Sequence, residues 1–276
     1  MLAELNLKRV QEMETADYAA LVRAYQAVSP RLRAEGKNVG CCPHPNAHYR
    51  GDPLHYGFRP ETAKVPLMVG SVFGEFASFS PLPWDRDAMS EAEQIGVIRE
   101  RWGESAADAL IPLFREAYPE RHLIDLLRLD YVFRMPEIRY IAERSKLNGS
   151  TWSYLFNMDQ PIDGGNTPWH CSDIPYVFRN ISLVEYPHGP GAEEGLAERI
   201  QEEVFGAVMA FAASGNPNHG AIPAWEPCIP GKEKTLLVDA DTRVRENHDH
   251  RLMKELERHL EVIRRREKEF MGNIQH

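Results

Sequence analysis

The spacing of apolar residues along the chain alternates between the period of a helix and the period of a strand. Helical spacing predicts helix in six segments, of which 119–147 holds two helices in succession: 16–34, 90–101, 105–117, 119–147, 195–214 and 250–271. Short apolar or alternating runs predict three strands: 65–71, 151–158 and 234–239. Strands that alternate with long helical stretches are typical of an α/β fold with a largely parallel sheet flanked by helices.

The predicted sheet is small for a chain of this length. Three parallel strands leave two open edges and a thin core, although 276 residues suffice for one large domain. Residues 38–64 are rich in Pro, Gly, His and Asn, which predicts a long irregular segment rather than further strands. We therefore expect an incomplete sheet, part of which lies outside this chain.

Composition narrows the functional classes. The chain is 43% hydrophobic and 26% charged, as in ordinary globular proteins, and its net charge of −9 disfavours binding to nucleic acid. It has no apolar run of the length that spans a bilayer and no apolar signal core near Met1, so we expect no membrane association and a cytoplasmic location. A missing upstream half could nevertheless carry a signal peptide.

Two segments place chemically active side chains after predicted strands. Glu75 follows the first strand, and His170 follows the second strand and its connection. Loops at the carboxyl ends of parallel strands are where such sheets place their chemistry. These two loops are therefore the candidate site.

Here the sequence resembles the type-B carboxylesterases, the esterase and cholinesterase family. The apolar run 65–70 is followed by Glu75, five residues after Gly70, as in the family's triad-acid motif. His170 stands three residues before Asp173 and the run Ile-Pro-Tyr-Val-Phe, as the family's histidine does. A third match is the segment 211–218 with its downstream tryptophan at 225. The matches keep the family's order over roughly residues 55–250.

The resemblance implies an α/β-hydrolase with a Ser–His–Glu triad that hydrolyses small-molecule carboxylic esters without a cofactor. In such a triad the histidine takes the serine proton and the carboxylate orients the imidazole. His170 is then the general base and Glu75 its orienting acid. Asp173 either supports the histidine loop or caps the turn that follows it.

The nucleophile of that triad has no counterpart in this chain. In α/β-hydrolases the serine precedes the acid, yet residues 1–74 hold neither a nucleophile elbow nor a glycine-rich oxyanion loop. The Gly-Glu-Ser-Ala-Ala segment around Ser105 follows a helix, lies after Glu75 and lacks the last glycine, so Ser105 is interpreted as a helix cap. Phe76 also departs from the family, which usually has glycine after the acid.

We therefore interpret residues 1–276 as a single partial hydrolase domain, the C-terminal half of a truncated or split enzyme. Its expected partner is a separately encoded N-terminal esterase half, without which the chain should be inactive. Two alternatives stay open. The chain is a non-catalytic binding protein of the same family, or it is an inactive gene fragment.

Other reactive side chains have simpler interpretations. Cys171 beside His170 is a poor candidate for a substitute nucleophile, because adjacent residues point apart. The run 247–250 is expected to be a solvated loop before the last helix. A zinc site is disfavoured, because adjacent cysteines rarely bind one ion and no second ligand pair follows at a standard spacing; its candidate ligands are Cys41, Cys42, His44 and His48.

Overall fold

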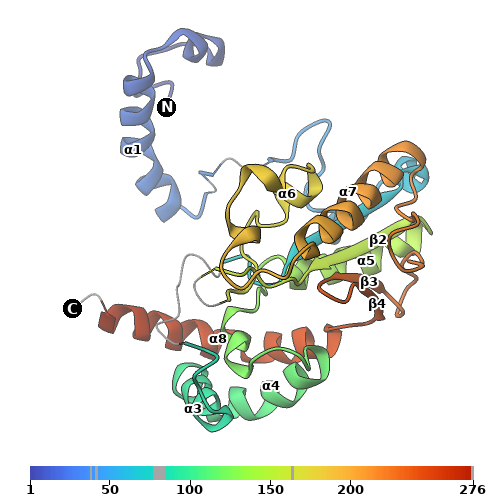
Figure 1. Cartoon of the computed structure of the whole chain (residues 1–276). Helices are drawn as coiled ribbons and strands as arrows, with labels where there is room; N and C mark the ends of the chain where they lie inside the picture. The colour runs from blue at the N-terminus through green and yellow to red at the C-terminus, as the bar shows by residue number, and fades with distance from the viewer. Residues whose placement is uncertain (38, 41–42, 77–84, 163–164, 275–276) are drawn as a thin grey trace. The chain divides into compact units, whose positions relative to one another are not determined.

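The computed structural model describes residues 1–37, 39–40, 43–76, 85–162 and 165–274 (Figure 1). The chain divides into two compact units, residues 1–57 and 58–276. The first unit holds α1 (Tyr18–Ala34), which Asp17 caps by accepting a hydrogen bond from the Ala20 amide at 2.8 Å. It also holds the short elements η1 (Val10–Thr15) and α2 (Pro53–Tyr56).

The second unit is built on one sheet with the strand order β1-β2-β3-β4. β1 (Leu67–Val72), β2 (Thr151–Phe156) and β3 (Lys234–Val238) run parallel, as predicted, and β4 (Arg243–Glu246) pairs antiparallel with β3. The sequence analysis missed β4, because its four residues are mostly charged and show no apolar alternation. β1 forms one edge of the sheet.

Helices cover both faces of this sheet (Figure 1). On one face, α6 (Ile174–Val177) and α7 (Leu196–Ser214) enclose a core with Trp152, Phe156 and Leu236. On the other face a second core includes Leu155, Leu237 and the helices α3 (Glu91–Trp102), α4 (Glu104–Ala117), α5 (Arg134–Leu147) and α8 (His250–Ile274). Short 3-10 turns complete the unit: η2 (Pro60–Lys64), η4 (Leu123–Arg128), η5 (Ile181–Leu183) and η6 (Tyr186–His188).

Most of the predicted helices are confirmed. α3 begins with the capping box that the sequence indicates, in which Ser90 and Glu93 satisfy each other's backbone amides. The segment 119–147 differs from the prediction of two α-helices, because its first part is the 3-10 turn η4 and only α5 is α-helical. Ser105 lies inside α4, whose N-cap is Gly103, so the helix prediction is right and the cap assignment is wrong.

A buried ionic network lies between the sheet and the helices of the second core. Arg134 at the start of α5 is 1% exposed and donates to both carboxylate oxygens of Asp249, at 2.8 and 2.9 Å. It also donates to Glu137 at 2.9 Å. Glu137 in turn accepts hydrogen bonds from Ser71 on β1 and Ser153 on β2. The network therefore joins α5 and the residue just before α8 to serine side chains on β1 and β2.

The expectation of a solvated loop at 247–250 is wrong. Asp249 is 1% exposed, and Arg134 holds the pKa of its carboxyl far below the ordinary range, against the opposing effect of burial. Burial lowers the pKa of the adjacent His248 to about 4, so this imidazole stays neutral near pH 7. The sequence alone indicates a surface loop here, because Arg134, which pairs with Asp249, lies 115 positions away.

Arg134→Met should destabilise the second unit strongly. The substitution leaves the carboxylates of Asp249 and Glu137 buried without their cation, which costs about 3–5 kcal/mol. The free energy of unfolding from urea titration measures this loss. Arg139→Met is the matched control, because its ion pair with Glu257 is about half exposed and should contribute less than about 1 kcal/mol. Equal losses in both variants would contradict a structural role for the network.

Candidate active site

The loops that follow β1 and β2 meet through their backbones. The Gly74 amide donates to the Pro168 carbonyl at 3.1 Å, and the His170 amide donates to the Glu75 carbonyl at 2.9 Å. These bonds extend the parallel pairing of the two strands beyond their ends. They bring the two predicted site residues side by side, although 95 positions separate them in sequence.

The side chains of Glu75 and His170 form a short hydrogen bond. His170 Nδ1 lies 2.6 Å from Glu75 Oε2, and the other oxygen of Glu75 accepts from the Val72 amide at 3.0 Å. Glu75 is 7% exposed, whereas the His170 side chain is about half exposed. The buried carboxylate therefore fixes the ring, places a proton on Nδ1 and leaves Nε2 as the proton acceptor. This arrangement can supply general base and general acid chemistry.

The turn 169–172 presents the imidazole. The Trp169 amide donates to Ser172 Oγ at 3.1 Å, and the Ser172 amide donates back to the Trp169 carbonyl at 2.9 Å. Between them Cys171 adopts a left-handed φ of 68°, a conformation that costs a non-glycine residue about 1 kcal/mol or more. Tyr186 braces the turn by donating to the Ser172 carbonyl at 2.9 Å. The turn is thus held on both sides of His170.

Asp173 lies behind the histidine turn. Its carboxylate accepts a hydrogen bond from the Tyr154 hydroxyl at 3.4 Å, which links the turn to β2. Burial raises the pKa of Asp173, and the nearby negative charge of Glu75 acts in the same direction. The residue occupies the N-cap position of α6, but its side chain makes no capping hydrogen bond there. Its support of the histidine loop stays a prediction.

Asp130 is a site residue that the sequence analysis missed. Its carboxylate accepts from the amides of Val132, Phe133 and Arg134 at 3.0 Å each, and its own amide donates to the Phe73 carbonyl at 2.8 Å. It therefore ties the start of α5 to the end of β1. Burial raises the pKa of this carboxyl to about 6, and Glu75 adds repulsion. An aspartate four residues before the first residue of a helix, where its carboxylate can accept from the amides at the helix start, is the sequence signal that could have indicated it.

The remaining sequence candidates do not join the site. Cys41 and Cys42 lie outside the described residues, so the zinc alternative is untested there. Across the part of the chain that the structure describes, no three His, Cys, Asp or Glu side chains are grouped to hold a metal ion. Within the same residues, no helix combines the length and apolarity needed to cross a membrane.

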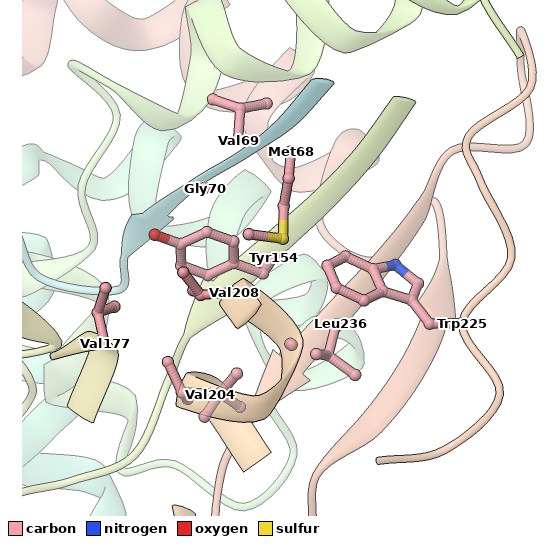
Figure 2. A pocket seen from close by; sticks show the side chains of 11 residues that line it. Met68, Val69, Gly70, Tyr154, Val177, Val204, Val208, Trp225 and Leu236 are labelled. Atoms are coloured by element: carbon pink, nitrogen blue, oxygen red, sulfur yellow. The ribbon is translucent and has the colours of Figure 1, made fainter. Parts of the chain in front are cut away.

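An apolar pocket opens on the α7 face of the sheet, next to β1 (Figure 2). Its volume is about 390 Å³. The ring of Tyr154 lies against β1 there, because Gly70 has no side chain; a Cβ at this position would lie 2.4 Å from the ring. The same tyrosine reaches Asp173 with its hydroxyl, so the pocket and the histidine turn share a wall. The other walls are Met68, Val69, Val177, Val204, Ala207, Val208, Trp225, Leu236 and Val238.

Comparison with known proteins places the chain in a family. The family model described as "Carboxylesterase family" matches residues 44–256, which is most of the chain. The chain therefore belongs to the carboxylesterase family, and its open sheet flanked by helices is an α/β-hydrolase-like fold. The predicted family and fold class are confirmed. The single domain over residues 1–276 stays a prediction.

The similar proteins are esterases and related hydrolases. A solved esterase of Clostridium hathewayi, described as able to hydrolyse aliphatic aromatic polyesters, is 36% identical, with a TM-score of 0.84. The match covers 93% of this chain and 50% of that one. A solved PNB esterase at 17% identity and a TM-score of 0.57, with 92% and 52% covered, shares the fold.

Two curated relatives are matched over shorter segments. The para-nitrobenzyl esterase of Bacillus subtilis is 22% identical over 182 residues, which are 65% of this chain and 35% of the relative. The phenmedipham hydrolase of Pseudarthrobacter oxydans is 25% identical over 146 residues, 52% and 29% of the two chains. The chain thus matches about a third of these curated relatives and half of the solved esterase.

Asp130→Asn should change how stability depends on pH. The pKa of Asp130 is raised from its ordinary value of 3.8 to about 6 in the folded chain, so the folded state holds this proton more tightly than the unfolded state. The resulting stabilisation is complete below the unfolded pKa and is lost as pH rises through the folded pKa. The free energy of unfolding of the wild type should therefore fall relative to the variant by about 3 kcal/mol between about pH 4 and 7.

Urea titrations across this pH range measure the difference. Asp108→Asn, which removes an exposed carboxylate on α4, is the control and should show a small change. If the free energy of unfolding of the wild type did not fall relative to that of Asp130→Asn as pH rises, the pKa of Asp130 would not be raised in the folded chain.

Proposed function

We propose that this chain supplies the acid and the histidine of a serine-type carboxylic ester hydrolase. The observation that carries the proposal is the 2.6 Å contact between His170 Nδ1 and buried Glu75 Oε2, with the His170 side chain about half exposed. Membership of the carboxylesterase family supports the reaction class. The ordered pair also favours catalysis over the non-catalytic alternative, since binding alone does not require an oriented imidazole.

The proposed reaction uses both nitrogens of His170. Nε2 accepts the hydroxyl proton of a serine as its oxygen attacks the ester carbonyl, and Nδ1–H stays bonded to Glu75, which stabilises the imidazolium. The imidazolium then returns the proton to the departing alcohol, leaving an acyl-enzyme. Water repeats the sequence and releases the acid. Backbone amides outside this chain's described site would bind the oxyanion.

The nucleophile elbow has no counterpart in this sequence. We propose that the serine comes from an N-terminal esterase half, corresponding to the portion of the relatives that the chain does not match. The proposed docking site is the edge of β1. Leu67 and Phe73 direct their amides to β2, so by alternation the amides of Met68 and Gly70 face the other edge. Such an edge is a template for another strand.

The apolar pocket beside β1 supports the same docking site. Met68 and Gly70 line it, so the edge that would take the strand continues into an apolar hollow (Figure 2). Parallel sheets are covered on both faces in known folds. A partner that adds a parallel strand to β1 and an apolar helix next to α7 would cover both features at once.

Glu75→Gln and His170→Ala should abolish hydrolysis in the complex. The probe enzyme is this chain co-purified with the part of the Clostridium hathewayi esterase that it does not match. Loss of the orienting carboxylate or of the base lowers kcat by about 10⁴-fold in serine hydrolases. Release of 4-nitrophenol from its acetate ester measures the rate. Asp108→Asn is the surface control and should retain the full rate. A stable complex that is inactive as wild type, or active with alanine at 170, would refute the proposal.

Met68→Pro should weaken assembly of that complex while leaving the isolated chain folded. Proline removes the amide that faces the open edge and is tolerated on edge strands, because the β1–β2 bonds use the alternate amides. We expect binding to the N-terminal half to weaken about tenfold or more, measured by calorimetry. Met68→Ala separates the amide from the side chain and should weaken binding less. Unchanged binding by the proline variant would exclude β1 as the docking edge.

A further inference from the structure

Two phenyl rings from separate segments lie beside the imidazole of His170. Phe76 follows Glu75, and Phe133 is the N-cap residue of α5. The ring of His170 is parallel to those of Phe76 and Phe133 within 10° and 9°, and the two phenyl rings are parallel within 19°. Side chains from three segments are therefore aligned at one place.

The distances define a compact group rather than a column of stacked rings. The centroids lie 5.6 Å apart for Phe76 and Phe133, 6.5 Å for Phe76 and His170, and 6.3 Å for Phe133 and His170. In a column the outer pair would be about twice as far apart as neighbours. The near-equal distances instead place the two phenyl rings side by side next to the imidazole.

This aromatic surface is accessible and firmly held. Phe76 is 42% exposed and Phe133 is 45% exposed, so both rings present apolar area at the surface beside a half-exposed imidazole. The backbone of Phe133 is fixed by the hydrogen bond from its amide to the Asp130 carboxylate at 3.0 Å. Phe76 follows directly on Glu75, which is buried and bonded to the Val72 amide. These bonds fix the backbone from which Phe133 extends and the residue that precedes Phe76.

We propose that Phe76 and Phe133 form an aromatic shelf that binds an aromatic ring bonded directly to the scissile ester. The inference rests on the proposed function. A serine oxygen within hydrogen-bonding distance of Nε2 holds the ester carbonyl next to the imidazole. The phenyl centroids lie 6.3 and 6.5 Å from the imidazole centroid, so a ring attached to that carbonyl would pack against them if it lay within the 4.5–7 Å range in which aromatic pairs attract. The shelf therefore selects esters of aromatic acids over esters of saturated acids of the same size.

The first test measures binding to the chain alone, so it does not require a serine. Methyl benzoate and methyl cyclohexanecarboxylate have the same heavy atoms and differ in the aromaticity of the ring. Ligands of this size bind with Kd on the order of 1 mM, within reach of NMR titration. The signals of the His170 ring protons, assigned by their loss in His170→Gln, report the binding. We expect the benzoate to bind about threefold to tenfold more tightly.

Phe76→Leu and Phe133→Leu keep an apolar side chain and remove the ring. Each should therefore bring the ratio of the two dissociation constants closer to one. Phe178→Leu, at a phenylalanine that is 68% exposed outside the trio, is the matched control and should keep the preference. Equal binding of the two esters by the wild type, or a preference that survives in both leucine variants, would overturn the shelf.

A second test uses the complex and separates substrate binding from positioning of the imidazole. If the shelf binds substrate, the leucine variants lower kcat/KM for the benzoate and leave that for the cyclohexane ester nearly unchanged. An equal fall for both esters, with a shifted pH profile, would assign the rings to positioning of His170 and overturn the proposal. Failure of the complex to hydrolyse either ester would refute the proposed function alone, since the binding test stands without turnover.

Discussion

The parallel pairing of β1 with β2 is the constraint on which the site depends. Val72 and Phe156 are partners in register at the carboxyl ends of the two strands, so the segments that follow both strands leave the sheet at the same end. Glu75 follows within three residues, and the longer connection after β2 returns to pair with Gly74 before His170. In an antiparallel pair the two loops would lie at opposite ends of the strands. The contact between Glu75 and His170 is therefore a consequence of strand direction.

Helix α5 connects this end of the sheet to the interior. Its first turn carries Arg134, the centre of the buried ionic network, directly after Phe133 beside the imidazole. Asp130 fixes both residues through their amides. A buried ion pair is costly to desolvate, and it is a poor source of net stability compared with apolar packing. Its value here is geometric, because the network allows few positions for the start of α5 and hence for the rings at the site.

Sequence predicted the features whose causes are local. The Ser90–Glu93 capping box set the start of α3, and apolar spacing gave the three parallel strands. Glu75 and His170 were found through family motifs, since spacing alone leaves a loop carboxylate unremarkable. Contacts between distant segments were missed. Asp249 looked like a solvated residue because its partner Arg134 is 115 positions away, and β4 lacked any apolar alternation.

The bond between the Val72 amide and Glu75 has a consequence for assembly. Val72 follows Met68 and Gly70 in the set of amides that face away from β2, yet the carboxylate already occupies its donor. A strand that added to this side of β1 would find amide donors at Met68 and Gly70 but not at Val72. Glu75 would thereby limit the length of a neighbouring strand, and with it the distance from His170 at which the turn after that strand begins.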